Sequence, residues 1–363
     1  MSARRVFVGT PGFEGALVAE LADLGAVRMN ETAGLVEAAE PTPGVTLDPV
    51  FARQQLPAAI ALRGASVATL AEAAYAAVEA AVDRAEGPFT LHAFAAPGVP
   101  PEVASRATLV GRELLARLQA RRRRAARAYV PPEGSAARTR ELTLVLQLLL
   151  VARDQAWVSA ARPTPLAFGW DVAPWPAGVA PVALDRRPPS RAYRKLAEAF
   201  LWLVVAPTTG QVCVYLGGAP GGWSYVALAH GARVIAVDRA PMEPPVRGHR
   251  GLTAIAGNAF TYVPPKPVDW LLSDVICEPA RAFELMQRWL ENAWCRNLVV
   301  TVKFKGADGY GVLGELPAIL SAGGARRWRV KHLHHNKNEV TVMALAASGV
   351  RPAAPAGTIG GAR

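Results

Sequence analysis

The pattern of apolar and polar positions is most regular in the C-terminal half of the chain. Short apolar runs typical of strands alternate there with segments whose apolar residues recur every three or four positions, as on one face of a helix. The predicted strands cover 211–216, 232–238, 252–256, 269–274, 297–303, 327–335 and 339–345, and the predicted helices cover 190–204, 222–230, 278–293 and 310–322. Repeated strand–helix units predict a doubly wound parallel sheet, which binds ligands at the carboxyl ends of its strands.

The last two predicted strands are separated only by Asn336–Asn338. This connection is too short for a crossover helix, so the two strands should form an antiparallel hairpin. A parallel sheet closed by an antiparallel hairpin resembles the Rossmann-like class I methyltransferase fold more than a dehydrogenase. We therefore predict an α/β fold of this type for residues 190–346.

The N-terminal half alternates less regularly. We predict strands at 4–9, 88–95, 142–151 and 156–161 and helices at 13–24, 68–84 and 101–124, which indicates one or two small α/β units in residues 1–161. Residues 162–189 are rich in Pro, Trp and Asp and are typical of a linker or a long ordered connection. Residues 347–363 consist mainly of small residues, Pro and Gly, which predicts a flexible tail.

Composition excludes several classes of protein. Apolar residues make up 51% of the 363 residues, enough for substantial cores. The longest apolar runs, near 142–152 and 200–207, are shorter than the roughly 20 residues that span a bilayer, and the first residues lack the apolar stretch of a secretory signal. Cys213, Cys277 and Cys295 show no CxxC spacing, which argues against a zinc site or a disulfide framework. We expect a cytoplasmic protein without a membrane or metal partner.

The chain is basic, with a formal net charge of +11, which favours a polyanionic partner. Arg121–Arg124, followed by Arg127, is the densest basic run. It is either a solvated helix face or a patch that contacts RNA through its phosphates. Every lysine lies at or after Lys195, although the chain has 40 Lys and Arg residues. Lysine, unlike arginine, can lose its proton in a protein, so Lys195 and Lys303 are candidates for chemistry.

A glycine-rich turn follows the first predicted strand of the C-terminal sheet. It lacks the Lys-Ser/Thr pair of a phosphate loop and the GxGxxG spacing of a dinucleotide loop. S-adenosylmethionine (SAM) has no phosphate and needs only a close backbone approach, and Asp238, at the end of the next strand, suits a ribose diol. That acid alone does not separate SAM from NAD, and a purely structural turn is a further alternative. We predict a SAM site at Gly217, Gly218, Ala219, Pro220, Gly221, Gly222, Trp223 and Asp238.

Four charged residues are expected beside this site. Asp274 and Lys303 end neighbouring strands, Lys195 lies on the helix before the sheet, and Glu339 begins the last strand. Two lysines interleaved with two carboxylates can keep one amine poised to accept a proton, because the second cation opposes its charge. Such an amine could deprotonate an alcohol during methyl transfer. The alternative for each residue alone is an ordinary surface charge.

A second cluster is discounted. Lys331-His-Leu-His-His335 resembles a metal motif, but His332 and His334 share one face of a strand while His335 takes the other. Because no acid or cysteine lies at a suitable spacing, we interpret these residues as polar positions of the hairpin.

The motifs resemble a known family. Ser190-Arg-Ala-Tyr-Arg-Lys195 is similar to the SRxxxKL signature of FtsJ-type RNA ribose 2′-O-methyltransferases, and LGGAPGGW, WLLSD, VVTVKFKG and NEVTV are similar to that family's other segments. The likeness is closer to its bacterial 23S rRNA cytidine 2′-O-methyltransferase branch, the RlmM type. That branch shares the segments Pro11–Glu14, Phe51–Gln54, Pro189–Phe200, Val237–Met242, Asp274–Ala280 and Trp289–Arg296.

The resemblance implies SAM as methyl donor, a cytidine of 23S rRNA as target, and an N-terminal RNA-binding region with a THUMP-like module. It makes Lys303 the proton acceptor, Lys195 and Glu339 its positioning partners, and Asp274 the residue between cofactor and lysines. Two positions depart from the branch, which has acids where Tyr215 and Asn258 stand. Asn258 can still accept a hydrogen bond from an adenine amino group through its carbonyl oxygen. The two departures keep one alternative open, a catalytically silent RNA- or ribosome-binding protein on the same fold.

Overall fold

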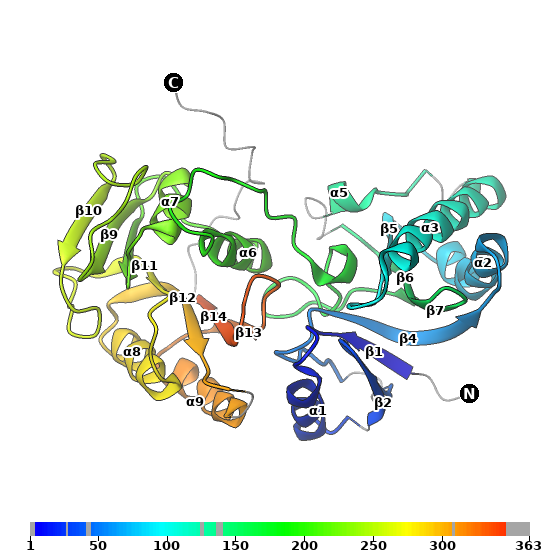
Figure 1. Ribbon diagram of the computed structural model, residues 1–363, viewed down its shortest axis with the longest axis horizontal. Helices are drawn as coiled ribbons and strands as arrows, with labels where there is room; N and C mark the ends of the chain where they lie inside the picture. The colour runs from blue at the N-terminus through cyan, green and yellow to red at the C-terminus, as the bar shows by residue number, and fades with distance from the viewer. Residues whose placement is uncertain are drawn as a thin grey trace. The chain divides into compact units, whose positions relative to one another are not determined.

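The computed structural model describes residues 4–26, 28–40, 45–123, 127–135, 141–306 and 309–345. The chain divides into two compact units, Met1–Val179 and Ala180–Arg363 (Figure 1). The boundary lies inside the 162–189 segment that the sequence predicts to be a connection. The expected flexible tail, residues 347–363, lies outside the described residues.

The first unit is built on one mixed sheet with the strand order β2-β3-β1-β4-β7-β6-β5. Its strands are β1 (Arg4–Val8), β2 (Arg28–Thr32), β3 (Leu35–Ala39), β4 (Gln54–Arg63), β5 (Phe89–Ala95), β6 (Leu144–Ala152) and β7 (Gln155–Ala161). Its helices are α1 (Glu14–Asp23), α2 (Val67–Asp83), α3 (Pro101–Arg121) and the short α5 (Pro132–Ser135), with a 3₁₀ turn, η2 (Pro176–Gly178). The apolar faces of α2 and α3 pack with β5, β6 and β7 in a shared core.

The sequence pattern does not reveal β2, β3 or β4. In β4 the signal fails because Pro57 interrupts the strand and the polar Gln54 and Gln55 are buried. Both glutamines are satisfied by later backbone: the Gln54 side chain donates to Ala173 O at 3.0 Å, and Gln55 Nε2 donates to Asp171 O at 2.7 Å. The connection is therefore an ordered part of this unit up to its boundary.

The second unit is a seven-stranded sheet with the order β10-β9-β8-β11-β12-β14-β13. The strands are β8 (Val212–Leu216), β9 (Arg233–Asp238), β10 (Leu252–Ala256), β11 (Val268–Ser273), β12 (Cys295–Lys303), β13 (Arg327–Lys331) and β14 (Glu339–Leu345). β10, β9, β8, β11 and β12 are parallel, whereas β14 runs antiparallel to both β12 and β13. The predicted parallel sheet with a closing antiparallel hairpin is confirmed.

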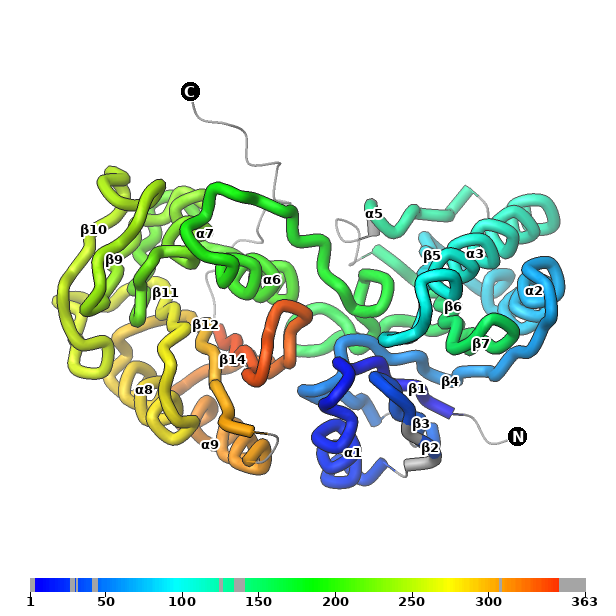
Figure 2. The backbone as a smooth tube through the Cα atoms, in the orientation of Figure 1, coloured from blue at the N-terminus to red at the C-terminus, as the bar shows by residue number. Residues whose placement is uncertain are grey.

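Helices cover both faces of this sheet. They are α6 (Tyr193–Leu203), α7 (Gly222–Ala229), α8 (Pro279–Glu291) and α9 (Leu316–Ala322), and α9 is preceded by the 3₁₀ segment η3 (Tyr310–Glu315). Figure 2 shows α6 and α7 on one face and α8 and α9 on the other. The strand order reverses between β8 and β11, and the loops that leave these two strands carry the glycine-rich turn and Asp274. Among the described residues, no helix is long and apolar enough to cross a membrane.

The hairpin differs from the prediction in one respect. The strand expected at 327–335 ends at Lys331, and residues 332–338 form a loop before β14. The buried carboxylate of Glu198 on α6 explains the early end, because it accepts hydrogen bonds from the backbone N–H groups of His334 (2.8 Å) and His335 (3.0 Å). These backbone groups therefore bond to a side chain, not to a neighbouring strand.

Candidate active site

The four charged residues predicted to lie together do lie together. Lys195 is in the first turn of α6, Asp274 directly follows β11, Lys303 ends β12 and Glu339 begins β14. Their side chains are between 6% and 21% exposed. We call this group the Lys-Asp-Lys-Glu cluster.

Lys195 is the more closely paired of the two lysines. Its Nζ lies 2.9 Å from both carboxylate oxygens of Asp274 and 2.9 Å from Oε1 of Glu339. Burial opposes its charge, but the two carboxylates outweigh burial and raise the pKa of Lys195 above its usual range. Lys195 is therefore a cation at neutral pH. It is not the lysine of the cluster that could accept a proton.

Lys303 is held differently. Its Nζ donates to the backbone carbonyl of Asp274 at 2.8 Å, lies 3.0 Å from Asp274 Oδ1, and lies 3.8 Å from Glu339 Oε2. Thr301, the preceding residue on the same face of β12, donates to the same Asp274 oxygen at 2.7 Å. The side chain of Lys303 is the more exposed of the two lysines, at 21% against 12%. Of the two amines, that of Lys303 is therefore the more accessible to a bound molecule.

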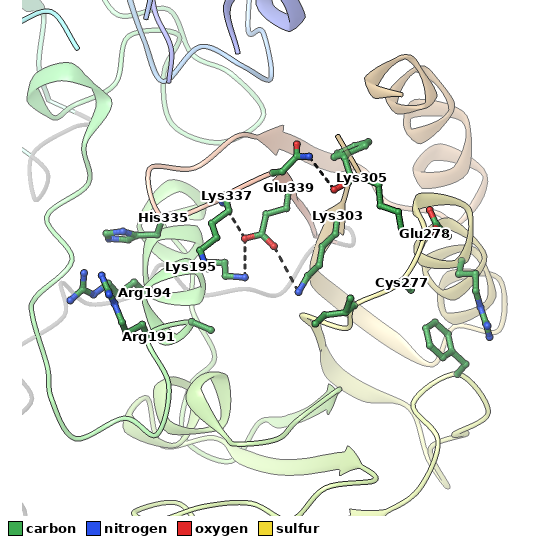
Figure 3. Close-up of a pocket in the computed structure, with 16 residues that line it drawn as sticks. Arg191, Arg194, Lys195, Cys277, Glu278, Lys303, Lys305, His335, Lys337 and Glu339 are labelled. Atoms are coloured by element: carbon green, nitrogen blue, oxygen red, sulfur yellow. Dashed lines mark hydrogen bonds and ion pairs between the residues drawn. The ribbon is translucent and has the colours of Figure 1, made fainter. Parts of the chain in front are cut away.

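A cleft of about 950 Å³ opens beside the cluster (Figure 3). Lys195, Lys303 and Glu339 line it, whereas the glycine-rich turn does not. Its other charged or titratable lining residues are Arg191, Arg194, Cys277, Glu278, Arg281, Lys305, His335 and Lys337. Because cations outnumber acids along its walls, the cleft suits an anionic molecule.

The glycine-rich turn has a shape that few other residues would permit. Gly217 and Gly221 adopt φ values of +73° and +114°, which disfavour any residue with a Cβ. A Cβ at Gly222 would lie 2.3 Å from the Ser190 hydroxyl, so this glycine lets the turn pack against the segment leading into α6. The backbone conformation thus requires glycine at 217 and 221, and close packing requires it at 222. Gly218, Ala219 and Pro220 lie between these positions.

Asp238 anchors this turn from the next strand. Its Oδ2 accepts from Ala219 N at 3.0 Å and its Oδ1 accepts from Ala240 N at 2.9 Å. An ionised carboxylate has about four acceptor positions, so each oxygen retains capacity for a ribose hydroxyl. Asn258, after β10, uses Oδ1 to accept from Phe260 N at 3.0 Å, and that oxygen likewise keeps a second acceptor position.

Tyr215 occupies the position of the expected acid at the end of β8. Its ring is buried and stacks on Trp223, with centroids 5.6 Å apart and planes 13° apart. Burial, followed by the nearby carboxylates of Asp274 and Asp238, raises the pKa of its hydroxyl well above the usual value. Tyr215 is therefore a neutral, packed residue between two acids.

Trp223 is fully buried, so its indole does not form an exposed wall of a pocket. Its Nε1 donates to the carbonyl of Ala192 at 2.9 Å. Ala192 is the N-cap of α6, three residues before Lys195. The tryptophan thus ties the glycine-rich turn to the helix that carries one member of the cluster.

One buried acid that the sequence does not single out also supports the site. Glu198 is fully buried, one turn after Lys195 on α6, and its carboxylate holds the backbone of the 332–338 loop as described above. That loop leads directly into Glu339. The sequence did contain a sign of this role, since Glu198 is an acid on an otherwise apolar helix face. A carboxylate buried there requires specific hydrogen-bond partners.

Two arginines of the basic run in the N-terminal unit are paired with acids. Arg121 lies 2.8 Å from Glu72, and Arg122 lies 2.7 Å from Glu79 and 2.8 Å from Asp83, all three acids on α2. Arg123 is exposed, and Arg124 lies outside the described residues. Two members of the run therefore stabilise the α2–α3 pair.

The histidines of the hairpin do not assemble a metal site. His332 Nε2 is 2.8 Å from the carbonyl of Lys337, and the rings of His334 and His335 contact each other with centroids 5.0 Å apart. Within the described ranges, no group of three or more His, Cys, Asp or Glu side chains is arranged to hold a metal ion.

Comparison with known proteins shows which family part of the chain resembles. Residues 188–295 match the FtsJ-like methyltransferase family, a range that includes Lys195 and Asp274. The chain is 36% identical over 188 residues to a ribosomal RNA large subunit methyltransferase M of Alkalilimnicola ehrlichii, covering 50% of this chain and 51% of that protein. It is 36% identical over 208 residues to the protein of the same name from Laribacter hongkongensis, covering 54% of this chain and 57% of that one.

The chain thus spans about half the length of the curated relatives it matches. Among solved structures, a Burkholderia thailandensis 1,6-didemethyltoxoflavin-N1-methyltransferase is 17% identical, covering 52% of this chain and 96% of that one with a TM-score of 0.32, too weak a likeness for an argument. The resemblance found in the sequence motifs is confirmed for residues 188–295, which match the FtsJ-like methyltransferase family.

Proposed function

We propose that this chain is a SAM-dependent RNA ribose 2′-O-methyltransferase whose target is a cytidine of 23S rRNA. The observation that carries the proposal is the Lys-Asp-Lys-Glu cluster, in which one lysine is fixed as a cation and the other faces a basic cleft. A ribose hydroxyl becomes a competent nucleophile when a base accepts its proton. Lys303 is in the position to do so.

Each member of the cluster has a distinct role in this proposal. Lys303 accepts the proton of the 2′-hydroxyl at Nζ. Asp274 orients that amine through its carboxylate and its backbone carbonyl. Lys195 offsets one of the two negative charges of Asp274 and Glu339 and holds both carboxylates in place. Glu339 holds Lys195 and flanks Lys303 from the opposite strand.

The loops at the carboxyl ends of β8, β9 and β10 fit SAM. Bound SAM would supply an electrophilic methyl group. Asp238 has acceptor capacity left for a ribose diol, and Asn258 for an adenine amino group. The turn from Gly217 to Gly222 can bring its backbone close to the amino-acid end. Because Tyr215 is neutral, backbone groups or Asp274 take over the role of the acid that the family has there.

The substrate assignment rests on charge and on the relatives. The cleft is lined mainly by cations, and the curated relatives are named as methyltransferases of large-subunit ribosomal RNA. We propose that the N-terminal unit, with its THUMP-like module, adds RNA affinity and that the protein acts in the cytoplasm. Within the basic run, Arg123 is the described member that we propose for RNA contact, since Arg121 and Arg122 are paired.

Two measurements test this function. Isothermal titration of the full chain should show SAM binding, and no binding at millimolar SAM would favour the silent RNA-binding alternative that Tyr215 and Asn258 keep open. Mass spectrometry of ribosomal RNA from a deletion strain should show the loss of one ribose methyl group. An unchanged methylation pattern would rule out the ribosomal target.

A further inference from the structure

The cleft is electrostatically asymmetric. At one end, Lys305 forms an ion pair with Glu278, which leaves Arg281, stacked over the ring of Phe260, as the further cation there. At the other end lie Arg191, Arg194 and His335 (Figure 3). Within the described part of the chain, neither of these arginines forms an ion pair. This end of the cleft carries positive charge that no neighbouring acid balances.

The backbone adds to the positive potential at this end. Arg191 and Arg194 flank the start of α6, which begins at Tyr193 and is eleven residues long. The dipole of a helix N-terminus favours an anion, although the N–H groups of Tyr193, Arg194 and Lys195 bond to the carbonyls of Ser190, Arg191 and Ala192. His335 approaches from the 332–338 loop, whose position is fixed by the hydrogen bonds to buried Glu198. Two elements thus bring side chains with N–H donors to one place.

The pKa of His335 reflects the positive charge around it. Burial, together with the neighbouring His334, Arg194 and Arg191, lowers the pKa of His335 to about 4. At neutral pH this imidazole is therefore uncharged and retains one N–H donor. Two guanidinium groups and a neutral donor match the several acceptor oxygens of a phosphodiester, for which arginine has the better geometry.

We propose that Arg191, Arg194 and His335 form a subsite for a phosphate of the RNA strand, beside the ribose that reaches Lys303. This inference rests on the proposed function, since it places a phosphate of that function's substrate. Lys195, one position after Arg194, lies between this subsite and Lys303 in the cleft (Figure 3). The subsite would set the register of the strand, so that one ribose faces the amine.

The first test uses inorganic phosphate and the full chain. The ring resonances of His335 are followed by NMR over pH, assigned among the six histidines with the variant His335→Gln. Phosphate bound between the arginines offsets their charge, so the pKa of His335 should rise with added phosphate. The rise should vanish in the double variant Arg191→Gln/Arg194→Gln. No change in wild type, or the same change in the double variant, would overturn the subsite.

The second test measures affinity for an RNA oligonucleotide over a series of salt concentrations. The double variant should bind roughly tenfold more weakly at low salt, and the slope of log affinity against log salt should fall by about 0.7 for each phosphate that is no longer neutralised. Arg296→Gln is the matched control, because this arginine is 77% exposed and lies near the opposite end of β12 from Lys303. Unchanged affinity in the double variant, or an equal weakening in the control, would contradict the proposal.

Both tests measure binding and not methyl transfer. If both effects are found but no methyl group is transferred, the phosphate subsite stands and the proposed function fails. If the enzyme is active but neither effect is found, the subsite fails and the proposed function stands.

Discussion

Lys303 and Glu339 lie directly opposite each other in the antiparallel pair of β12 and β14, with Lys303 Nζ 3.8 Å from Glu339 Oε2. This contact depends on the antiparallel direction of β14. Glu339 is the first residue of its strand, and only an antiparallel strand brings its first residue to the edge where the parallel strands end. The closing hairpin thus contributes a carboxylate to the site as well as completing the sheet.

Replacing Lys303 with Ala should reduce methyl transfer by roughly 10²–10⁴-fold, the contribution usual for a positioned general base. SAM affinity should be unchanged, because Lys303 lies in the cleft and not on the glycine-rich turn. Initial rates and isothermal titration measure the two effects. Lys266→Ala, at an exposed lysine in the loop before β11, is the control and should keep its activity. Turnover retained in the Lys303 variant would remove this residue as the base.

Replacing Lys195 with Met should destabilise the protein by about 3 kcal/mol at neutral pH, since the buried carboxylates of Asp274 and Glu339 lose a partner. The folded-state pKa of Lys195 is raised, so its stabilising effect is complete below its ordinary pKa of 10.5 and is lost as the pH rises through the raised value. The difference in melting temperature between wild type and variant should therefore begin to shrink as the pH rises above 10.5. A difference that stays constant up to that range and beyond would contradict the role given to Lys195.

Replacing Glu198 with Gln should lower kcat by about tenfold, because the loss of a charged hydrogen-bond acceptor costs about 1.5 kcal/mol or more and loosens the loop before Glu339. SAM affinity should stay within about twofold, since the glycine-rich turn is held by other contacts. Glu284→Gln, at an exposed position of α8, provides the matched control. Parallel losses of SAM binding and kcat would indicate general misfolding instead of a positioning role.

Replacing Tyr215 with Ala should destabilise the domain by about 3–5 kcal/mol, because it removes a buried ring that stacks on Trp223 and leaves a cavity. Tyr215→Phe keeps the stack, so it should cost about 1 kcal/mol and leave SAM affinity nearly unchanged. Chemical denaturation and SAM titration measure both quantities. A large loss of SAM affinity in the Phe variant would show that the hydroxyl itself contacts the cofactor.

The sequence predicts the C-terminal fold and the clustering of four site residues because both follow from one rule. Parallel strands present their carboxyl ends at one edge, so Asp274 and Lys303 had to be neighbours, and a short connection between the last strands had to bring Glu339 back to the same edge. These inferences depend on element order and direction, which the apolar pattern reveals.

Pairings between distant segments were not predictable in the same way. The acids that pair with Arg121 and Arg122 lie on α2, far from them in sequence, so the basic run looked like an open surface. Tertiary packing likewise determines that Trp223 is buried against Tyr215 and that Glu198 accepts hydrogen bonds from the hairpin loop. A pattern along one element carries no information about which residue of another element faces it.

The central claim is best tested by methyl transfer from isotopically labelled SAM to a 23S rRNA fragment, with the labelled position mapped by mass spectrometry. The full chain should place one label on a ribose 2′-oxygen, and an RNA with a 2′-deoxynucleotide at the mapped position should remain unlabelled. Label on a base, or label that persists on the deoxy RNA, would contradict the account.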